Sequence, residues 1–81
     1  PGDAVAAYSP LAGFYRERLV VPAASAVRAP RNVPLADAGV LLVSAATAYQ
    51  ALVDVAAVRA WQTVLVTAAA GATGTYALEL A

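Results

Sequence analysis

A glycine turn between an apolar run and a helical pattern is the part of this sequence whose residue types and spacing could do chemistry. The turn reads Ala69-x-Gly71-x-x-Gly74, which is the dinucleotide-binding pattern G-x-G-x-x-G with alanine at its first position. In this pattern one glycine lets the backbone approach a pyrophosphate, and another lets the following helix pack closely on the preceding strand. The unpaired N–H groups in the first turn of the helix then face the anion. The spacing therefore predicts a phosphate-binding turn.

The residues on both sides of this turn have the patterns that such a site requires. Residues 62–67 have an apolar centre without polar alternation, which is typical of a strand covered on both faces in a parallel sheet. From Ala72 onward, apolar residues recur at four-residue spacing, as Tyr76 and Leu80 do, and this spacing predicts a helix. We therefore expect a strand, a turn and a helix in that order, which is the context that the glycine pattern needs.

The first half of the chain has patterns of short strands and a helix start. A turn that leads into a strand is expected over residues 2–8, and strands are expected over residues 14–21, with one face in water, and over residues 26–28. Pro34 at a first helical position, with Asp37 near the positive end of the helix dipole, then predicts a short helix.

A second helix is expected farther along the chain, because Gly39 weakens the first one. Ser44 is the expected N-cap of this second helix. Its apolar stripe, which we interpret as core packing, consists of Tyr49, Leu52, Val53 and Ala56.

The length and composition exclude several kinds of function for this segment. Its 81 residues suffice for one small domain at most, and a complete nucleotide-binding fold does not fit. The net charge is zero and the charged residues are scattered, so we expect no nucleic-acid partner. The chain has no Cys and no His, so it supplies no disulfide, thiolate zinc site, histidine base or Ser-His pair.

Two further features concern the membrane and the extent of the chain. The most membrane-like stretch, residues 38–53, contains polar side chains and is close to the short limit for a bilayer span, so we expect no membrane partner. The chain begins at Pro1 without Met and ends at Ala81 within a helical pattern that nothing closes. We therefore expect an internal piece of a longer protein.

Taken together, these motifs resemble the medium-chain dehydrogenase/reductase superfamily, in particular its zinc-independent quinone oxidoreductase (zeta-crystallin-like) branch. The matching stretches, which follow in the order of that family, are Gly2-Asp3-x-Val5, Gly13-Phe14-Tyr15-Arg16-Glu17, Leu19-Val20-Val21-Pro22-Ala23, Thr47-Ala48-Tyr49-Gln50-Ala51-Leu52 and Gln62-Thr63-Val64-Leu65-Val66 with the glycine turn. The resemblance implies an α/β chain. Residues 1–45 would be the C-terminal part of a GroES-like β-barrel domain and a connector, and residues 46–81 would begin a Rossmann dinucleotide-binding domain.

The resemblance is to the branch without zinc. Zinc alcohol dehydrogenases carry a four-cysteine lobe between the Gly-Asp strand and the Gly-x-Tyr turn, where this chain has only residues 4–12. The same enzymes place a catalytic zinc cysteine before the Thr-Ala-Tyr helix, where this chain has Val43 and Ser44. The resemblance thus implies hydride transfer without a metal site, by holding nicotinamide and substrate together.

The cofactor that the resemblance implies is NADPH, with NADH as the alternative. By analogy, Thr47 would lie near the nicotinamide, and the amides of Ala72 and Thr73 would lie nearest the phosphates. The implied cofactor-binding residues are Thr47, Ala69, Ala70, Gly71, Ala72, Thr73 and Gly74. Alternatively, the Thr47 hydroxyl bonds its own backbone. Tyr49 is interpreted as a packing residue rather than an acid, because no group near it in the sequence would adapt its phenol to proton transfer. No catalytic residue is assigned.

The chain departs from the family pattern at four positions. Trp61 stands where the family usually has the glycine of a tight turn, Ala68 and Ala72 replace usual glycines near the phosphates, and Arg16 replaces a small residue. A bulky residue such as Trp61 is costly where φ is positive. Either this turn has another shape, or the sequence has diverged under weak constraint.

The resemblance implies an NAD(P)H-dependent, zinc-free oxidoreductase that transfers hydride to a quinone or an activated carbon–carbon double bond. The alternatives are the enoyl-reductase domain of a polyketide synthase and a non-catalytic nucleotide-binding relative. We expect a small-molecule quinone or enone substrate and a cytoplasmic homodimer for the longer protein. The isolated chain is expected to be inactive and marginally folded, because its nucleotide-domain strand has no parallel neighbours.

Overall fold

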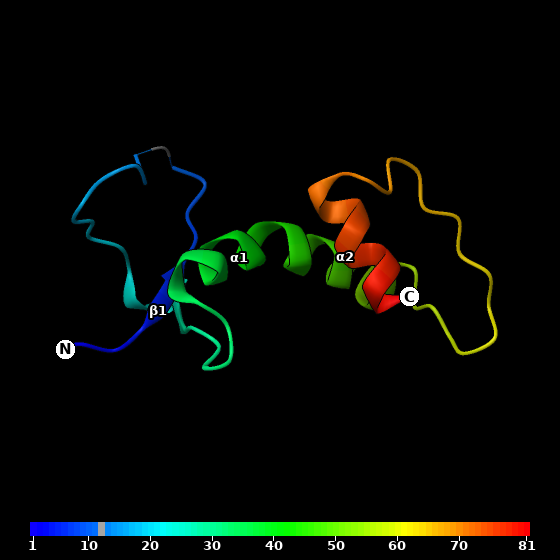
Figure 1. Ribbon diagram of the computed structural model, residues 1–81, viewed down its shortest axis with the longest axis horizontal. Coiled ribbons are helices and arrows are strands. Elements are labelled where there is room, and N and C mark those ends of the chain that lie inside the picture. The colour runs from blue at the N-terminus through cyan, green and yellow to red at the C-terminus, as the bar shows by residue number, and fades with distance from the viewer. Residues whose placement is uncertain (12) are drawn as a thin grey trace. The chain divides into compact units, whose positions relative to one another are not determined.

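The computed structural model describes residues 1–11 and 13–81 of the chain. Within these residues the elements follow in the order β1 (Val5–Ala7), the 3₁₀ helix η1 (Ala23–Ser25), β2 (Ala26–Arg28), α1 (Leu35–Tyr49), the π-helix η2 (Gln50–Val55) and α2 (Ala72–Leu80) (Figure 1). The chain divides into two compact units, Pro1–Leu42 and Val43–Ala81, and the boundary between them falls within α1. The chain thus contains both strands and helices, as expected.

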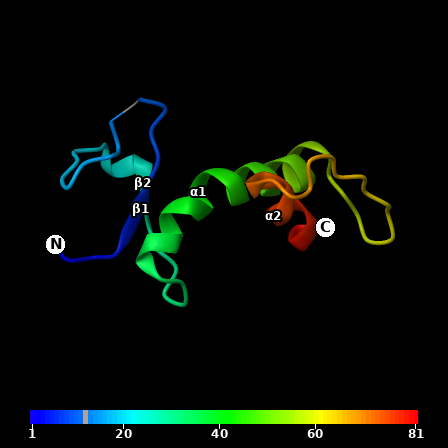
Figure 2. The same ribbon diagram turned by 45° about the horizontal axis from the view of Figure 1, so that its top comes forward.

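The first unit contains a short antiparallel sheet. Strands β1 and β2 pair with Ala6 opposite Val27, and both strands are labelled in Figure 2. The ladder continues on both sides, since the Ala29 N–H donates to the Ala4 carbonyl oxygen at 3.0 Å and the Tyr8 N–H donates to the Ser25 carbonyl oxygen at 3.3 Å. The strand expected within residues 2–8 is therefore confirmed as β1, and the strand expected over residues 26–28 is confirmed as β2 with the same bounds.

The strand expected over residues 14–21 does not form. The Arg16 N–H donates to the Phe14 carbonyl oxygen at 2.8 Å, which closes a three-residue turn and bends the backbone. Tyr15 and Val20 are fully exposed, so this segment has no buried apolar face. A half-buried strand needs both a ladder partner and a covered face, and residues 14–21 have neither among the described residues.

One continuous helix replaces the two that the sequence predicts. Its start after Pro34 is confirmed, because the N–H groups of Asp37 and Ala38 donate to the Pro34 carbonyl oxygen at 2.9 and 3.0 Å. Gly39 and Ser44 both lie inside α1, so the expected break and the expected cap at Ser44 are wrong. A helical glycine costs only about 1 kcal/mol relative to alanine, which the surrounding helical hydrogen bonds outweigh.

The helix then widens, and this changes which side chains are buried. Beyond Tyr49 the bonding is of the π type, as shown by the Ala56 N–H, which donates to the Ala51 carbonyl oxygen at 2.9 Å. Of the expected stripe, Leu52 is buried with 8% exposure, whereas Tyr49 is 50% and Val53 46% exposed. The stripe was predicted from α-helical spacing, and i→i−5 bonding turns successive side chains through a different angle.

The core of the second unit joins the helices to the segment before the glycine turn. It consists of Ala48, Leu52 and Ala77, with Val58, Val64, Val66 and Tyr76 packed against it. Val64 and Val66 are partly buried, whereas Leu65 between them is exposed, so one face of this segment is covered and not both.

The strand expected over residues 62–67 is not formed as a hydrogen-bonded strand. A strand is defined by pairing with a neighbour, and the described residues supply none for this segment. The order of an apolar segment, a turn and a helix is nevertheless present, and the helix expected from Ala72 onward is confirmed as α2.

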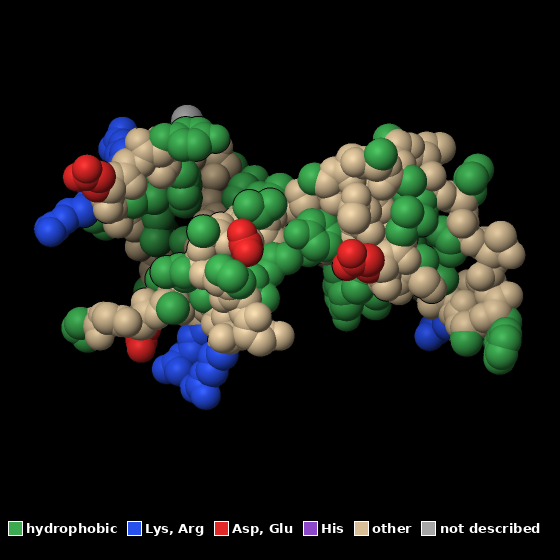
Figure 3. All heavy atoms as spheres, viewed as in Figure 1, with side chains coloured by type: hydrophobic (Ala, Val, Ile, Leu, Met, Phe, Trp, Pro, Cys, Tyr) green, Lys and Arg blue, Asp and Glu red, His purple; other side chains and the backbone are tan. Residues whose placement is uncertain are grey.

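Little of the apolar composition is buried within the described residues. Their buried hydrophobic residues are Ala6, Ala38, Ala48, Leu52 and Ala77. Figure 3 shows hydrophobic side chains over much of the face in view, with charged side chains in small groups between them. Alanine buries little area, so this core supports the expectation that the isolated chain is marginally stable, which stays a prediction.

The helical stretch Leu35–Val55 is 21 residues long and, by length and composition alone, sufficient to cross a membrane. Core helices of proteins that do not enter membranes have the same length and composition. Ala38, Ala48 and Leu52 on this stretch are buried. The absence of a membrane partner therefore stays a prediction.

Trp61 adopts a backbone conformation that favours glycine. It lies in a turn in which the Gln62 N–H donates to the Arg59 carbonyl oxygen at 3.2 Å and the Gln62 side-chain oxygen accepts from the Arg59 N–H at 2.7 Å. The φ angle of Trp61 is +72°, and its side chain is fully exposed, at 101%. The turn therefore keeps the positive φ for which glycine is suited, and tryptophan occupies it without contacts that compensate.

We expect Trp61→Gly to be more stable than Trp61→Ala in the full-length protein that contains this chain. Because a left-handed backbone costs a non-glycine residue about 1 kcal/mol, the free energies of unfolding should differ by about that amount. Both variants lose the same indole, so the comparison isolates the backbone term. Urea denaturation measures it, and equal midpoints for the two variants would contradict the prediction.

Candidate functional site

The glycine turn of the second unit is closed by a hydrogen bond across its base. The Gly71 N–H donates to the Ala68 carbonyl oxygen at 2.9 Å. Ala68 has a φ angle of +52°, so this alanine, like Trp61, takes the left-handed conformation usual for glycine. Gly71 then has extended angles (φ −76°, ψ 165°) and forms the N-cap of α2.

Gly74 is required by the close approach of α2 to this turn. A Cβ atom built on Gly74 would overlap the Ala68 carbonyl oxygen and would lie 2.7 Å from the Ala69 Cα. A Cβ on Gly71 would lie 3.3 Å from the same carbonyl oxygen, which is tight but tolerable. The sequence assigned one glycine to backbone approach and one to helix packing, and the packing role belongs to Gly74.

The N-terminus of α2 presents backbone donors. The first helical bond runs from the Thr75 N–H to the Gly71 carbonyl oxygen at 2.9 Å. The N–H groups of Ala72, Thr73 and Gly74 have no acceptor within the part of the chain that the structure describes, and no side chain caps this end. The first turn also holds no acidic side chain. These unpaired donors and the positive end of the helix dipole favour an anion.

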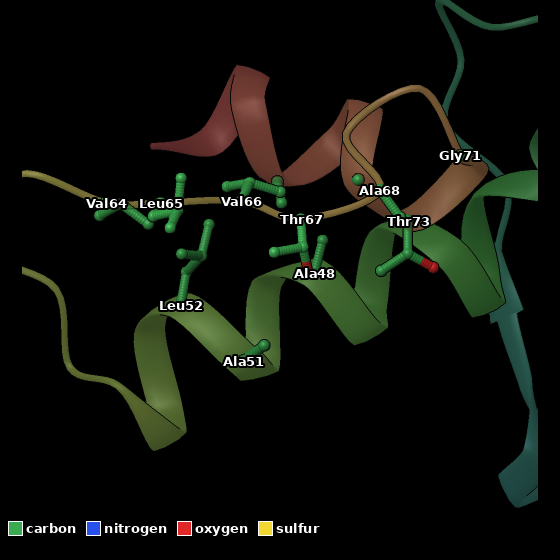
Figure 4. A pocket seen from close by; sticks show the side chains of 12 residues that line it. Ala48, Ala51, Leu52, Val64, Leu65, Val66, Thr67, Ala68, Gly71 and Thr73 are labelled. Atoms are coloured by element: carbon green, nitrogen blue, oxygen red, sulfur yellow. The ribbon is translucent and has the colours of Figure 1, made fainter.

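A cavity of about 460 Å³ lies beside this turn. It is lined by Ala48, Ala51, Leu52, Val64, Leu65, Val66, Thr67, Ala68, Gly71, Thr73, Gly74 and Ala77. Figure 4 shows Ala48 and Leu52 on the helix below the segment that carries Val66 and Thr67. The cavity thus offers apolar walls and threonine hydroxyls next to the unpaired amides of α2.

Six of the seven predicted cofactor-binding residues lie in the lining of the cavity or next to it. Gly71, Thr73 and Gly74 line the cavity, and Ala69, Ala70 and Ala72 belong to the adjoining turn and helix start.

Thr47 lies on α1, and its neighbour Ala48 lines the cavity. The Thr47 hydroxyl donates to the Val43 carbonyl oxygen at 2.6 Å, which is the backbone bond named as the alternative. A role for Thr47 near a nicotinamide stays a prediction.

Thr75 is a further residue of this site that the sequence patterns did not predict. Its hydroxyl oxygen lies 3.0 Å from the Gly71 carbonyl oxygen and 3.4 Å from the Ala69 carbonyl oxygen. The contact with Gly71 has a sequence signal, since a helical threonine can bond the carbonyl four residues earlier. The contact with Ala69 depends on how the turn folds back and has no such signal.

Comparison with known proteins identifies relatives that match between two thirds and nearly all of the chain. Prostaglandin reductase-3 of Bos taurus is 44% identical over 80 residues, which cover 99% of this chain and 20% of that protein. The Mus musculus protein of the same name is 42% identical over 79 residues, covering 98% of the chain and 20% of the relative. Quinone oxidoreductase-like protein 2 of Rattus norvegicus is 52% identical over 54 residues, covering 67% of the chain and 15% of the relative.

No family model matches the chain. No solved structure matches it either. The chain spans about a fifth of the length of the prostaglandin reductases that it matches, at 20% of each. The 80 residues matched in the bovine protein cover 99% of this chain. The chain therefore belongs to the medium-chain dehydrogenase/reductase superfamily and to its zinc-independent quinone oxidoreductase branch.

Proposed function

We propose that the full-length protein containing this chain is an NAD(P)H-dependent, zinc-free oxidoreductase that transfers hydride to a quinone or an activated carbon–carbon double bond. The observation that carries this proposal is the turn at Gly71 and Gly74, with unpaired helix amides beside an apolar cavity. The names of the relatives, a reductase and an oxidoreductase-like protein, support the same general reaction.

The residues of this turn fit a dinucleotide diphosphate. Gly71 brings the backbone to the edge of the cavity without a side chain, and the amides of Ala72 and Thr73 are free to donate. When bound, the reduced nicotinamide would supply the hydride. This chain would contribute the diphosphate cradle, and the helix that carries Thr47 would contribute one wall. We further propose that residues 1–45 end a GroES-like barrel and that residues 46–81 begin a Rossmann domain.

Two alternative functions share the same turn. The enoyl-reductase domain of a polyketide synthase would use the same cofactor, and the domains encoded next to this chain would distinguish it. A non-catalytic nucleotide-binding relative is favoured by one observation, namely the positive φ angles at Trp61 and Ala68, where the family has glycine. We also propose that the substrate is a small molecule and that the full-length protein is a cytoplasmic homodimer.

The expected result for the full-length protein is saturable NADPH binding and NADPH oxidation that depends on an added quinone or enone. Equilibrium titration measures the binding, and the loss of reduced-nicotinamide absorbance with a panel of quinones and enones measures turnover. NADH in place of NADPH tests the choice of cofactor. Binding without turnover on any member of the panel would favour the non-catalytic relative, and absence of binding to both nucleotides would overturn the proposal.

A further inference from the structure

We propose that Thr75 is a positioning residue that orients the backbone amides of the diphosphate-binding turn. The inference rests on the proposed function, since it concerns the same turn. Its starting point is the Thr75 hydroxyl, which is within hydrogen-bond distance of two backbone carbonyls of the turn, those of Gly71 and Ala69. The hydroxyl carries one proton, so it donates to one of these carbonyls at a time.

Holding a carbonyl also fixes the direction of an N–H group. A trans peptide unit is planar, and its C=O and N–H groups point in opposite directions. The described part of the chain contains no cis peptide bond. The Ala69 carbonyl shares a peptide unit with the Ala70 N–H, and the Gly71 carbonyl shares one with the Ala72 N–H. When the hydroxyl donates to either carbonyl and draws it toward α2, it directs the N–H group of the same peptide unit away from α2.

The two N–H groups that Thr75 would orient are available to a ligand. Neither Ala70 nor Ala72 donates its backbone N–H to an acceptor among the residues that the structure describes. Carbonyl oxygens that faced the same side would repel a diphosphate, whereas the amides attract it. The Thr75 hydroxyl would therefore not contact the anion itself. It would keep the carbonyl oxygens of the turn pointing away from the anion.

Among the described residues, the other hydrogen bonds of this turn are made by the backbone, and one of them is the first helical bond, from the Thr75 N–H to the Gly71 carbonyl oxygen. Ala68 has a left-handed φ of +52°, and the base of the turn is closed by the bond from Gly71 to Ala68. The cap residue of α2 is a glycine and offers no side chain to hold the first turn. Thr75 is the residue whose side chain reaches back from α2 to this turn.

The test compares Thr75→Val, which removes the hydroxyl but keeps the shape, with Thr75→Ser, which keeps the hydroxyl. The matched control is Thr63→Val, because the Thr63 side chain is exposed and makes no hydrogen bond to the described residues. All are made in the full-length protein. NADPH and ADP, which carries a diphosphate without nicotinamide, are titrated, and the steady-state constants and Tm are measured.

We expect Thr75→Val to raise the Kd for NADPH and ADP about fivefold, the size expected for one hydrogen bond. The KM for NADPH should rise by the same factor with kcat unchanged, and Thr75→Ser and Thr63→Val should behave as the unmodified protein. Wild-type affinity of Thr75→Val, or equal affinities of the valine and serine variants, would overturn the inference and leave the proposed function standing. If the unmodified protein binds neither nucleotide, both are overturned.

A second measurement needs no variant. Hydrogen exchange of the Ala70 and Ala72 amides in the full-length protein should slow when NADPH binds, because the two N–H groups would then donate to the diphosphate. Exchange that is unchanged at both amides, at saturating NADPH, would also overturn the inference.

Discussion

Replacing Gly74 with alanine is expected to lower the free energy of unfolding of the full-length protein by about 2 kcal/mol, the usual cost of forcing an extra group into a packed site. The added Cβ would overlap the Ala68 carbonyl oxygen and approach the Ala69 Cα to 2.7 Å. Both are backbone atoms, so no side-chain rotation relieves the overlap. Helix α2 and the turn would have to separate. Urea denaturation measures the loss, and the Kd for NADPH should rise with it.

Gly39→Ala is the matched control for this prediction, with the opposite sign. Gly39 lies within α1, and a Cβ built there meets no atom within 4 Å. Alanine should therefore stabilise the protein by about 0.5–1 kcal/mol through its higher helix propensity. If Gly74→Ala proved as stable as Gly39→Ala, the close packing of α2 on the turn would be refuted.

Gly71→Val is expected to raise the Kd for NADPH about 100-fold, as follows from losing two charge-assisted hydrogen bonds of about 1.5 kcal/mol each. Gly71 lines the cavity, so the valine methyl groups would occupy the space that the proposed function assigns to the diphosphate. Binding is measured by titration of the full-length protein.

The fold should survive this substitution. The angles of Gly71, φ −76° and ψ 165°, suit valine, and its added Cβ meets only the Ala68 carbonyl oxygen, at 3.3 Å. We therefore expect a Tm close to that of the unmodified protein, and Gly71→Ala should bind with intermediate affinity. Unchanged NADPH affinity of Gly71→Val would place the nucleotide elsewhere and refute the proposed site.

Substitutions at the two glycines of the turn are thus expected to change different quantities, the free energy of unfolding and the affinity for NADPH. Gly74 touches the backbone of the turn itself, so its substitution should act first on stability. Gly71 faces the cavity and has unstrained angles, so its substitution should act first on affinity. Measuring stability and affinity for both variants tests this division directly.

The sequence by itself determined the features of this protein that depend on local spacing. The glycine turn, the start of α1 after Pro34 and helix α2 after Gly71 all lie where the residue types place them. Helical bonds join residues close in sequence, so local residue types suffice to predict them. The motif order also led to the superfamily, which the relatives confirm.

Tertiary structure decided the features that depend on residues far apart in the chain. Residues 62–67 pair with no strand among the residues that the structure describes, because pairing requires a neighbour that local sequence cannot supply. Leu52 is buried and Val53 is not, because packing against Ala77 and a shift to π-type bonding select the inward face. The reach of Thr75 to the Ala69 carbonyl was likewise decided by how the turn folds back on α2, since a contact made across a turn depends on the path of the backbone and not on spacing alone.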